Sequence, residues 1–163
     1  MREFRIYKPS KDGKTGAATR LQFRPDDSHK KFVFFIESTL QIGFDKDGNA
    51  KFGWDTNGSK KITFKIEPSD IGEILSVLCR RKKYLGLSDG KGGGRGIFHK
   101  NNKSNTILNI NYIENINTEP FFYYRISRKT EKELLEIKHT LSLGEAEILR
   151  VLLEHFLIMT FIK

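Results

Sequence analysis

The chain has 163 residues, of which 37% are hydrophobic and 30% are charged, a composition typical of one globular domain. Its net charge of +9 arises from 29 Lys and Arg against 20 Asp and Glu. An excess of this size attracts polyanions, with nucleic acid first and anionic membrane surfaces second. The longest apolar run, Phe156 to Ile162, is too short to span a bilayer, so we expect no membrane partner.

The cysteine content and the N-terminal residues favour a reducing compartment. Cys79 is the one cysteine, which excludes an internal disulfide bond. Residues 1–5 contain neither an apolar signal segment nor a transit region rich in Arg and Ser. We therefore expect a cytoplasmic protein.

Hydrophobic patterning divides the chain into two similar halves, at about residues 13–84 and 96–162, joined by a Gly-rich loop at 89–96. In the first half, alternation of apolar and polar residues predicts strands at 2–7, 16–24, 31–42, 50–54 and 60–66. The spacing of apolar residues predicts a helix that is capped by Ser69 and runs to about Lys83.

The second half repeats this order of elements. Alternation predicts strands at 97–100, 106–114, 121–129 and 134–141. A capping box formed by Ser142 and Glu145 predicts the start of a helix over residues 143–161. We therefore predict a single domain over 1–163 with an α+β fold, in which a sheet followed by a helix occurs twice.

The last predicted helix is apolar on almost every side. Only Glu147, Arg150 and Glu154 form a narrow polar stripe along it. A helix of this kind is normally buried on most sides, and one sheet is not expected to cover it. We therefore expect the helices to pack in the core of a homo-oligomer.

The sequence contains no arrangement of residues that supports catalysis or metal binding. His29, His99, His139 and His155 lack the spacing of metal-ligand pairs, and no Ser-nucleophile motif is present. The Gly-rich loop at 89–96 lacks the Gly-Lys-Ser/Thr sequence of a phosphate-binding loop. We therefore expect no enzymatic activity, no cofactor and no metal.

Basic and aromatic residues interleave along the predicted strands, which is typical of surfaces that bind unpaired nucleic acid. Stacking on such rings contributes about 1–3 kcal/mol per base, while Lys and Arg neutralise phosphates. Because strand residues alternate between two faces, one of Tyr123 and Tyr124 must point into the core. The candidate contacts are Lys14, Arg20, Gln22, Arg24, Phe52, Trp54, Lys60, Lys61, Phe98, Lys100, Tyr112, Tyr123, Arg125 and Arg128. From the sequence, replacing Arg20 and Arg24 together with Ala is expected to weaken binding without unfolding the protein.

The order of the elements and several local segments resemble the Whirly family of plant single-stranded-DNA-binding proteins. The similar segments, in chain order, are residues 52–55 followed by 60–61, then 64–75, 97–100, 121–127 and 141–156. The resemblance spans about residues 13–162. It implies a Whirly-like α+β fold of two four-stranded antiparallel sheets, each followed by a helix, which mitochondrial guide-RNA-binding proteins and a class of transcription coactivators share. It also implies binding of single-stranded DNA in replication, recombination or repair, and a homotetramer packed through the helices.

One part of the resemblance is incomplete, and two alternative functions stay open. The family's Lys-Gly-Lys-Ala-Ala-Leu motif is matched only in part by residues 14–19, which leaves assembly beyond a tetramer open. The chain also lacks the organelle-targeting segment and acidic tail of the plant proteins, so we expect a relative from a bacterium or from a virus-infected host cell. An RNA-binding or RNA-annealing protein is the first alternative, because a sheet that binds by stacking does not reject a 2′-hydroxyl group. The second is a structural oligomer or transcription cofactor whose charge only aids solubility.

Overall fold

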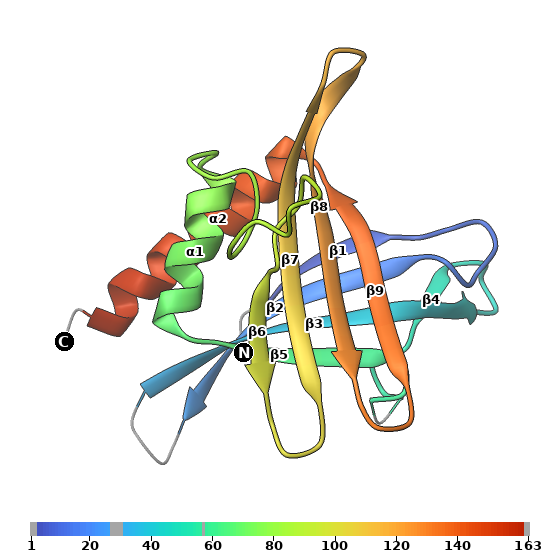
Figure 1. Cartoon of the computed structure of the whole chain (residues 1–163). Coiled ribbons are helices and arrows are strands. Elements are labelled where there is room, and N and C mark those ends of the chain that lie inside the picture. Colours follow the sequence, from blue (N-terminus) through green and yellow to red (C-terminus); the bar gives the residue numbers. More distant parts are fainter. Residues whose placement is uncertain (1–2, 27–30, 57, 162–163) are drawn as a thin grey trace.

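The computed structural model describes residues 3–26, 31–56 and 58–161 (Figure 1). The elements are, in chain order, β1 (Glu3–Lys8), β2 (Ala17–Asp26), β3 (Lys31–Phe44), β4 (Ala50–Phe52), β5 (Lys61–Ile66), α1 (Pro68–Leu78), β6 (Ile97–Lys100), β7 (Asn105–Asn115), β8 (Thr118–Lys129), β9 (Leu134–Leu141) and α2 (Leu143–Phe161). Within the described ranges, neither helix combines the length and hydropathy that a membrane crossing needs.

The strands form two antiparallel sheets. Sheet 1 contains β1 to β5, in which β2 lies between β1 and β3, and the other edge of β3 pairs with both β4 and β5. Sheet 2 is a meander of β6, β7, β8 and β9. The strands of the two sheets cross at a steep angle, and α1 and α2 lie together at one side (Figure 1). The predicted fold class is confirmed, with β1 added to the expected four strands of sheet 1.

Each sheet turns one face inward, and strand alternation decides which side chains that face carries. The fully buried rows are Leu21, Ile36 and Phe64 in sheet 1, and Leu108, Ile126 and Ile137 in sheet 2. α2 joins this core through Phe156, whose ring centroid lies 5.2 Å from Phe23 and 5.1 Å from Phe34. The outer faces carry the alternate side chains, some of which are exposed while others, such as Thr39 and Gln41, are covered.

The first helix differs from its predicted limits at both ends. Its N-cap is Glu67 rather than Ser69, and Glu67 and Asp70 form a capping box around Pro68. Pro is suited to the first helical position, because it lacks the N–H that would otherwise be unpaired there. The helix ends at Leu78, and Arg80 adopts a φ of 60°, a left-handed conformation that terminates helices. The basic run at 80–83 therefore follows the helix instead of forming its last turn.

The second helix has the predicted limits and two apolar faces. Its capping box is present, since the Ser142 amide donates to Glu145 Oε2 at 2.8 Å and the Glu145 amide donates to Ser142 Oγ at 3.2 Å. One apolar face is buried in the core. The opposite face is open to solvent in the single chain and carries Ile148, Val151, Ile158 and Met159. Between the faces, Arg150 pairs with both Glu147 and Glu154.

A chain of buried polar side chains joins the two sheets where they cross. The Tyr124 hydroxyl lies 2.8 Å from Ser38 Oγ, Ser38 Oγ lies 2.8 Å from Thr19 Oγ1, and Thr19 Oγ1 lies 2.8 Å from His139 Nε2. The other ring nitrogen, Nδ1, lies 3.2 Å from the Thr140 carbonyl oxygen. A carbonyl can only accept, so Nδ1 carries the proton and Nε2 accepts from Thr19. The chain is satisfied when His139 is neutral.

We expect acid to destabilise the protein through His139. Burial lowers the pKa of His139 to about 4 from its ordinary value of 6.5. Above about pH 6.5 the ring is neutral in both the folded and the unfolded protein, so it does not affect the free energy of unfolding. Between pH 6.5 and 4 the unfolded protein takes up the proton first, and the free energy of unfolding falls by up to about 3 kcal/mol. Urea unfolding at pH 7 and pH 5 measures this loss. The His139→Gln variant should lose less stability over the same interval, and an equal loss in both proteins would contradict the assignment.

Candidate nucleic-acid interface

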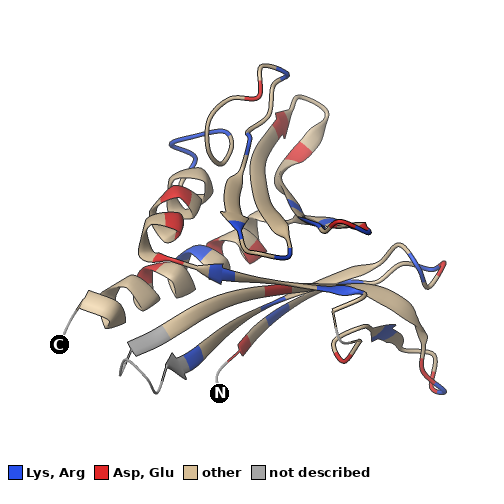
Figure 2. Ribbon diagram, turned by 60° about the horizontal axis from the view of Figure 1, so that its bottom comes forward, with Lys and Arg blue, Asp and Glu red and all other residues tan. Residues whose placement is uncertain are grey.

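The outer face of sheet 1 gathers basic and aromatic side chains from four strands and the segment after β4. Arg20, Gln22 and Arg24 alternate along β2, and they point away from the core. The predicted contacts Phe52, Trp54 and Lys61 lie on the same side, together with Arg5 and Tyr7 of β1. Figure 2 shows Lys and Arg on strands of both sheets and at hairpin ends, with acidic residues on both helices. The strand register thus assembles one surface from residues far apart in the sequence.

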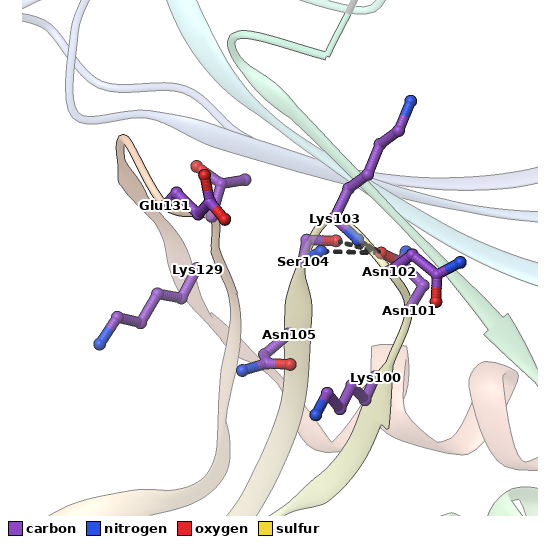
Figure 3. A pocket seen from close by; sticks show the side chains of 9 residues that line it. Lys100, Asn101, Asn102, Lys103, Ser104, Asn105, Lys129 and Glu131 are labelled. Atoms are coloured by element: carbon purple, nitrogen blue, oxygen red, sulfur yellow. Dashed lines mark hydrogen bonds between the residues drawn. The ribbon is translucent and has the colours of Figure 1, made fainter.

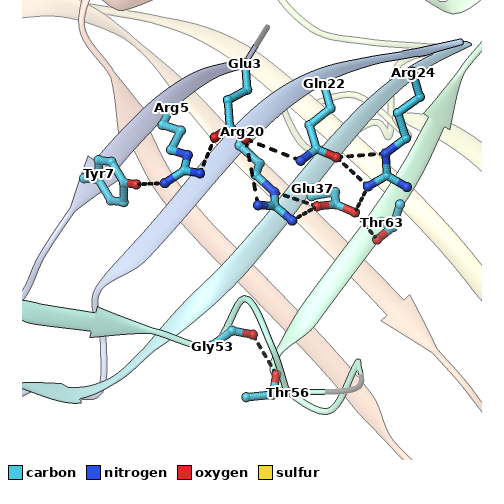
Figure 4. A network of polar contacts seen from close by, with 10 residues as sticks. All are labelled: Glu3, Arg5, Tyr7, Arg20, Gln22, Arg24, Glu37, Gly53, Thr56 and Thr63. Carbon is cyan, nitrogen blue, oxygen red and sulfur yellow. Dashed lines mark hydrogen bonds and ion pairs between the residues drawn. The ribbon is translucent and has the colours of Figure 1, made fainter. Parts of the chain in front are cut away.

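A buried carboxylate lies beneath the arginines of this face (Figure 4). Glu37 of β3 is 2% exposed, and it accepts a hydrogen bond from Arg20 Nε at 2.6 Å and one from Arg24 at 3.0 Å. Thr63 of β5 donates to the same carboxylate at 3.2 Å. Burial alone would raise the pKa of Glu37, but hydrogen bonding and the charge of Arg20, with Lys61 and Arg24, lower it below its ordinary value.

The two arginines that bind the Glu37 carboxylate differ in how much of each side chain a ligand can reach. The Arg20 side chain is 16% exposed and that of Arg24 is 39% exposed, so Arg24 offers more surface to a ligand. Gln22 is buried and accepts hydrogen bonds from Arg24, which makes it a spacer between the charged side chains. Arg20 therefore positions its neighbours more than it offers charge of its own.

Aromatic rings surround a shallow hollow beside Arg20. Its volume is about 410 Å³, and it is lined by Arg5, Tyr7, Pro9, Ala50, Phe52 and Trp54. The Arg20 guanidinium lies over the Trp54 ring at 4.5 Å from its centroid, and the Tyr7 and Phe52 ring centroids are 5.3 Å apart. The cation–π contact holds the indole in place. Rings held at the surface in this way can stack on unpaired bases.

The outer face of sheet 2 forms a second candidate surface. Phe98 and Lys100 of β6 and Tyr123 and Arg125 of β8 all point outward, and the Phe98 side chain is 54% exposed. Arg125 pairs with Glu136 of β9 at 2.6 Å. The expectation that one tyrosine of the 123–124 pair points inward is confirmed, because Tyr124 is buried.

Two predicted contacts lie on the inner face of sheet 2 instead. Tyr112 packs against Phe122, with ring centroids 5.2 Å apart, as part of the core margin. Arg128 donates to the carbonyl oxygens of Gly58 at 2.7 Å and Lys61 at 3.1 Å, so it ties sheet 2 to the loop before β5. Strand register therefore places both side chains on the opposite face from Tyr123 and Arg125, away from the proposed contact surface of sheet 2.

Lys14 and Lys60 lie in loops and make no described side-chain contact with the other candidates. Lys14 is exposed in the loop before β2, and Lys60 is exposed immediately before β5. Sequence reasoning missed Arg5, Tyr7 and Glu37. The alternation of β1 indicated that Arg5 and Tyr7 share one face of a strand. The neighbouring strand, which places them beside Arg20, is known only from the fold.

Comparison with known structures identifies the fold as the one that Whirly proteins share with trypanosome MRP proteins. WHY1 from Arabidopsis thaliana superposes with a TM-score of 0.62 at 15% identity, covering 98% of this chain and 84% of that chain. MRP1/MRP2 of a trypanosome superposes with a TM-score of 0.63 at 12% identity, covering 96% and 84%. A guide-RNA-binding protein complex bound to a gRNA gives 0.62 at 13% identity, covering 96% and 89%. No family model and no curated protein matches the sequence.

We expect Arg20 to contribute more to stability than Arg24. Arg20→Ala leaves the buried Glu37 carboxylate without its main partner and should cost about 2–3 kcal/mol, whereas Arg24→Ala should cost less than about 1 kcal/mol. Urea unfolding measures both. Combining Arg20→Ala with Glu37→Gln should restore part of the loss, and equal costs for the two arginines without such rescue would contradict this assignment. Replacing both arginines together, as the sequence suggested, is therefore not a clean test of binding.

Proposed function

We propose that this protein is a sequence-tolerant single-stranded-DNA-binding protein that acts in replication, recombination or repair. The observation that carries the proposal is the outer face of sheet 1, where a hollow lined by three aromatic rings and Arg5 shares one face with Arg24 and Lys61. Bases would stack on the rings, and the basic side chains would neutralise phosphates. Stacking tolerates any base, because every base has a π-face.

The outer face of sheet 2 would extend this contact. Phe98 and Tyr123 offer further rings, and Lys100 offers an ammonium group. Both outer faces carry exposed groups, among them Arg24 on sheet 1 and Phe98 on sheet 2, so one nucleic-acid strand could contact them in turn. The chain would act as one binding domain over residues 1–163, without an enzymatic step.

RNA is the second candidate ligand. One similar solved structure is described as a guide-RNA-binding protein complex bound to a gRNA. Stacking rings and phosphate contacts do not by themselves exclude a 2′-hydroxyl group. Direct comparison of matched DNA and RNA strands decides between the two.

We also propose that the chain assembles as a homotetramer through its helices. The solvent-facing side of α2 carries Ile148, Val151, Ile158 and Met159, and a stripe of this kind would be costly to leave in water. A second copy offers the same stripe, which suits a self-complementary helix contact.

Trp54 should report on binding directly. It is the single tryptophan, so quenching of its fluorescence by oligo-dT isolates the proposed hollow. Trp54→Ala should weaken binding by about 1–3 kcal/mol, or about fivefold to 150-fold, and Trp54→Phe should retain most of the affinity. Fluorescence anisotropy with labelled oligo-dT, matched RNA and duplex DNA across a salt series gives the affinities. Unchanged affinity of Trp54→Ala for the single strands would remove the hollow from the binding surface.

A charge on the solvent-facing side of α2 should dissociate the oligomer. Val151→Asp places a carboxylate in the proposed interface, so its mass in solution should fall towards that of one chain. Analytical ultracentrifugation measures this mass. Leu87→Asp, at a residue 74% exposed in the loop after α1, is the matched control and should leave the assembly unchanged. A wild-type protein that sediments as a monomer would refute the assembly.

A further inference from the structure

The ends of two hairpins in sheet 2 enclose a cleft that the proposed function does not yet use (Figure 3). The β6–β7 turn and the β8–β9 turn lie side by side at the same end of the sheet, and the cleft between them has a volume of about 330 Å³. Its lining residues all have polar or charged side chains; they are Lys100, Asn101, Asn102, Lys103, Ser104, Asn105, Lys129, Thr130 and Glu131.

The charges of this cleft are available to a ligand. Lys100, Lys103 and Lys129 outnumber Glu131, and among the described residues none of these four is in an ion pair. The turns are stabilised without them. In the β6–β7 turn, the side-chain oxygen of Asn101 accepts from the backbone amides of residues 103 and 104 at 2.9 and 2.8 Å. The ammonium groups therefore have no structural role in holding the turns.

Strand register places two of the lysines in one row. Lys100 pairs with Asn105, and Asn105 pairs with Lys129, so all three lie side by side on the outer face of sheet 2. Neighbouring strands are about 4.8 Å apart, which separates the two lysine backbones by about 10 Å. Lys103 extends away from this row (Figure 3). Flexible stems allow these ammonium groups to reach one phosphate or two successive phosphates.

The cleft also lies where sheet 2 meets the edge of sheet 1. The His99 ring, one residue before Lys100, stacks on Phe64 of β5 with centroids 4.3 Å apart. Arg128, one residue before Lys129, donates to the Lys61 carbonyl oxygen at the start of β5. These two contacts hold the β6 side and the β8 side of the cleft against β5. In the described structure β5 pairs with β3, and through β3 it belongs to sheet 1. A nucleic-acid strand that leaves the outer face of sheet 1 and passes β5 therefore meets the cleft before it reaches the outer face of sheet 2.

We propose that this cleft binds phosphodiester groups of a single nucleic-acid strand where that strand crosses from sheet 1 to sheet 2. The inference rests on the proposed function and adds a path to it. The three lysines hold the backbone at the crossing, and Asn105 lies between two of them as a hydrogen-bond donor. Glu131 opposes the bound phosphates and limits the affinity.

The test compares short and long strands on the full-length protein. The probes are oligo-dT of about 8 nucleotides, in the range of one binding platform, and oligo-dT of about 30 nucleotides, each with and without a 5′-phosphate. The triple variant Lys100→Ala, Lys103→Ala, Lys129→Ala should lose about tenfold or more in affinity for the long strand at low salt. The slope of log K against log salt should fall by about 2, and the short strand should be bound as before.

Two further variants sharpen this test. Lys46→Ala, Lys51→Ala, Lys83→Ala removes the same charge from exposed positions outside the cleft and should have a smaller effect. Glu131→Gln should tighten long-strand binding, which loss of folding cannot do. Circular dichroism confirms that each variant is folded.

The other outcomes overturn the inference. A triple variant that loses no more than the control, or that loses equally on short and long strands, excludes a crossing site. A loss seen only with 5′-phosphorylated strands assigns the cleft to strand ends instead. If wild-type protein binds no oligonucleotide, the proposed function itself fails and this inference fails with it, whereas wild-type binding with an unaffected triple variant refutes the inference alone.

Discussion

The hydrogen-bonded chain from Tyr124 to His139 fixes which face of each sheet is turned inward. Its hydroxyl and imidazole groups are buried, and each is satisfied only when its partner in the other sheet is in register. A slip of one residue in either sheet would leave these groups unpaired and would exchange the inner and outer side chains. The open surfaces of the protein therefore depend on this buried contact.

The outer faces differ in how their charge is organised. In sheet 1, Glu37 draws Arg20 and Arg24 together and keeps Arg20 largely within the surface, where it supports Trp54. In sheet 2, the lysines at the hairpin ends make no ion pair among the described residues, and Arg125 is balanced by Glu136. The net charge of +9 is therefore unevenly available: part of the positive charge on sheet 1 is neutralised by Glu37, whereas the lysines at the hairpin ends of sheet 2 can bind a ligand.

The periodicity of the chain predicted the strands, the final helix and the two-sheet architecture. What periodicity could not predict are the contacts between elements that are distant in the sequence. Alternation shows that Tyr123 and Tyr124 point in opposite directions, but it cannot say which side of a sheet is buried. The candidate list therefore included Tyr112 and Arg128, which the register places on the inner face. Glu37 was missed because a buried carboxylate in an apolar strand is recognisable only when its arginine partners on β2 are placed beside it. The early end of α1 follows from the left-handed Arg80, which no residue pattern announces.

The central claim is that the outer faces of both sheets contact a single nucleic-acid strand. Ultraviolet cross-linking of long oligo-dT to the protein, with mass-spectrometric mapping of the linked residues, tests it most directly. The account predicts cross-links to Trp54 or its ring neighbours on sheet 1 and to Phe98 or Tyr123 on sheet 2. Cross-links confined to α1 and α2, or to the Gly-rich loop alone, would contradict it.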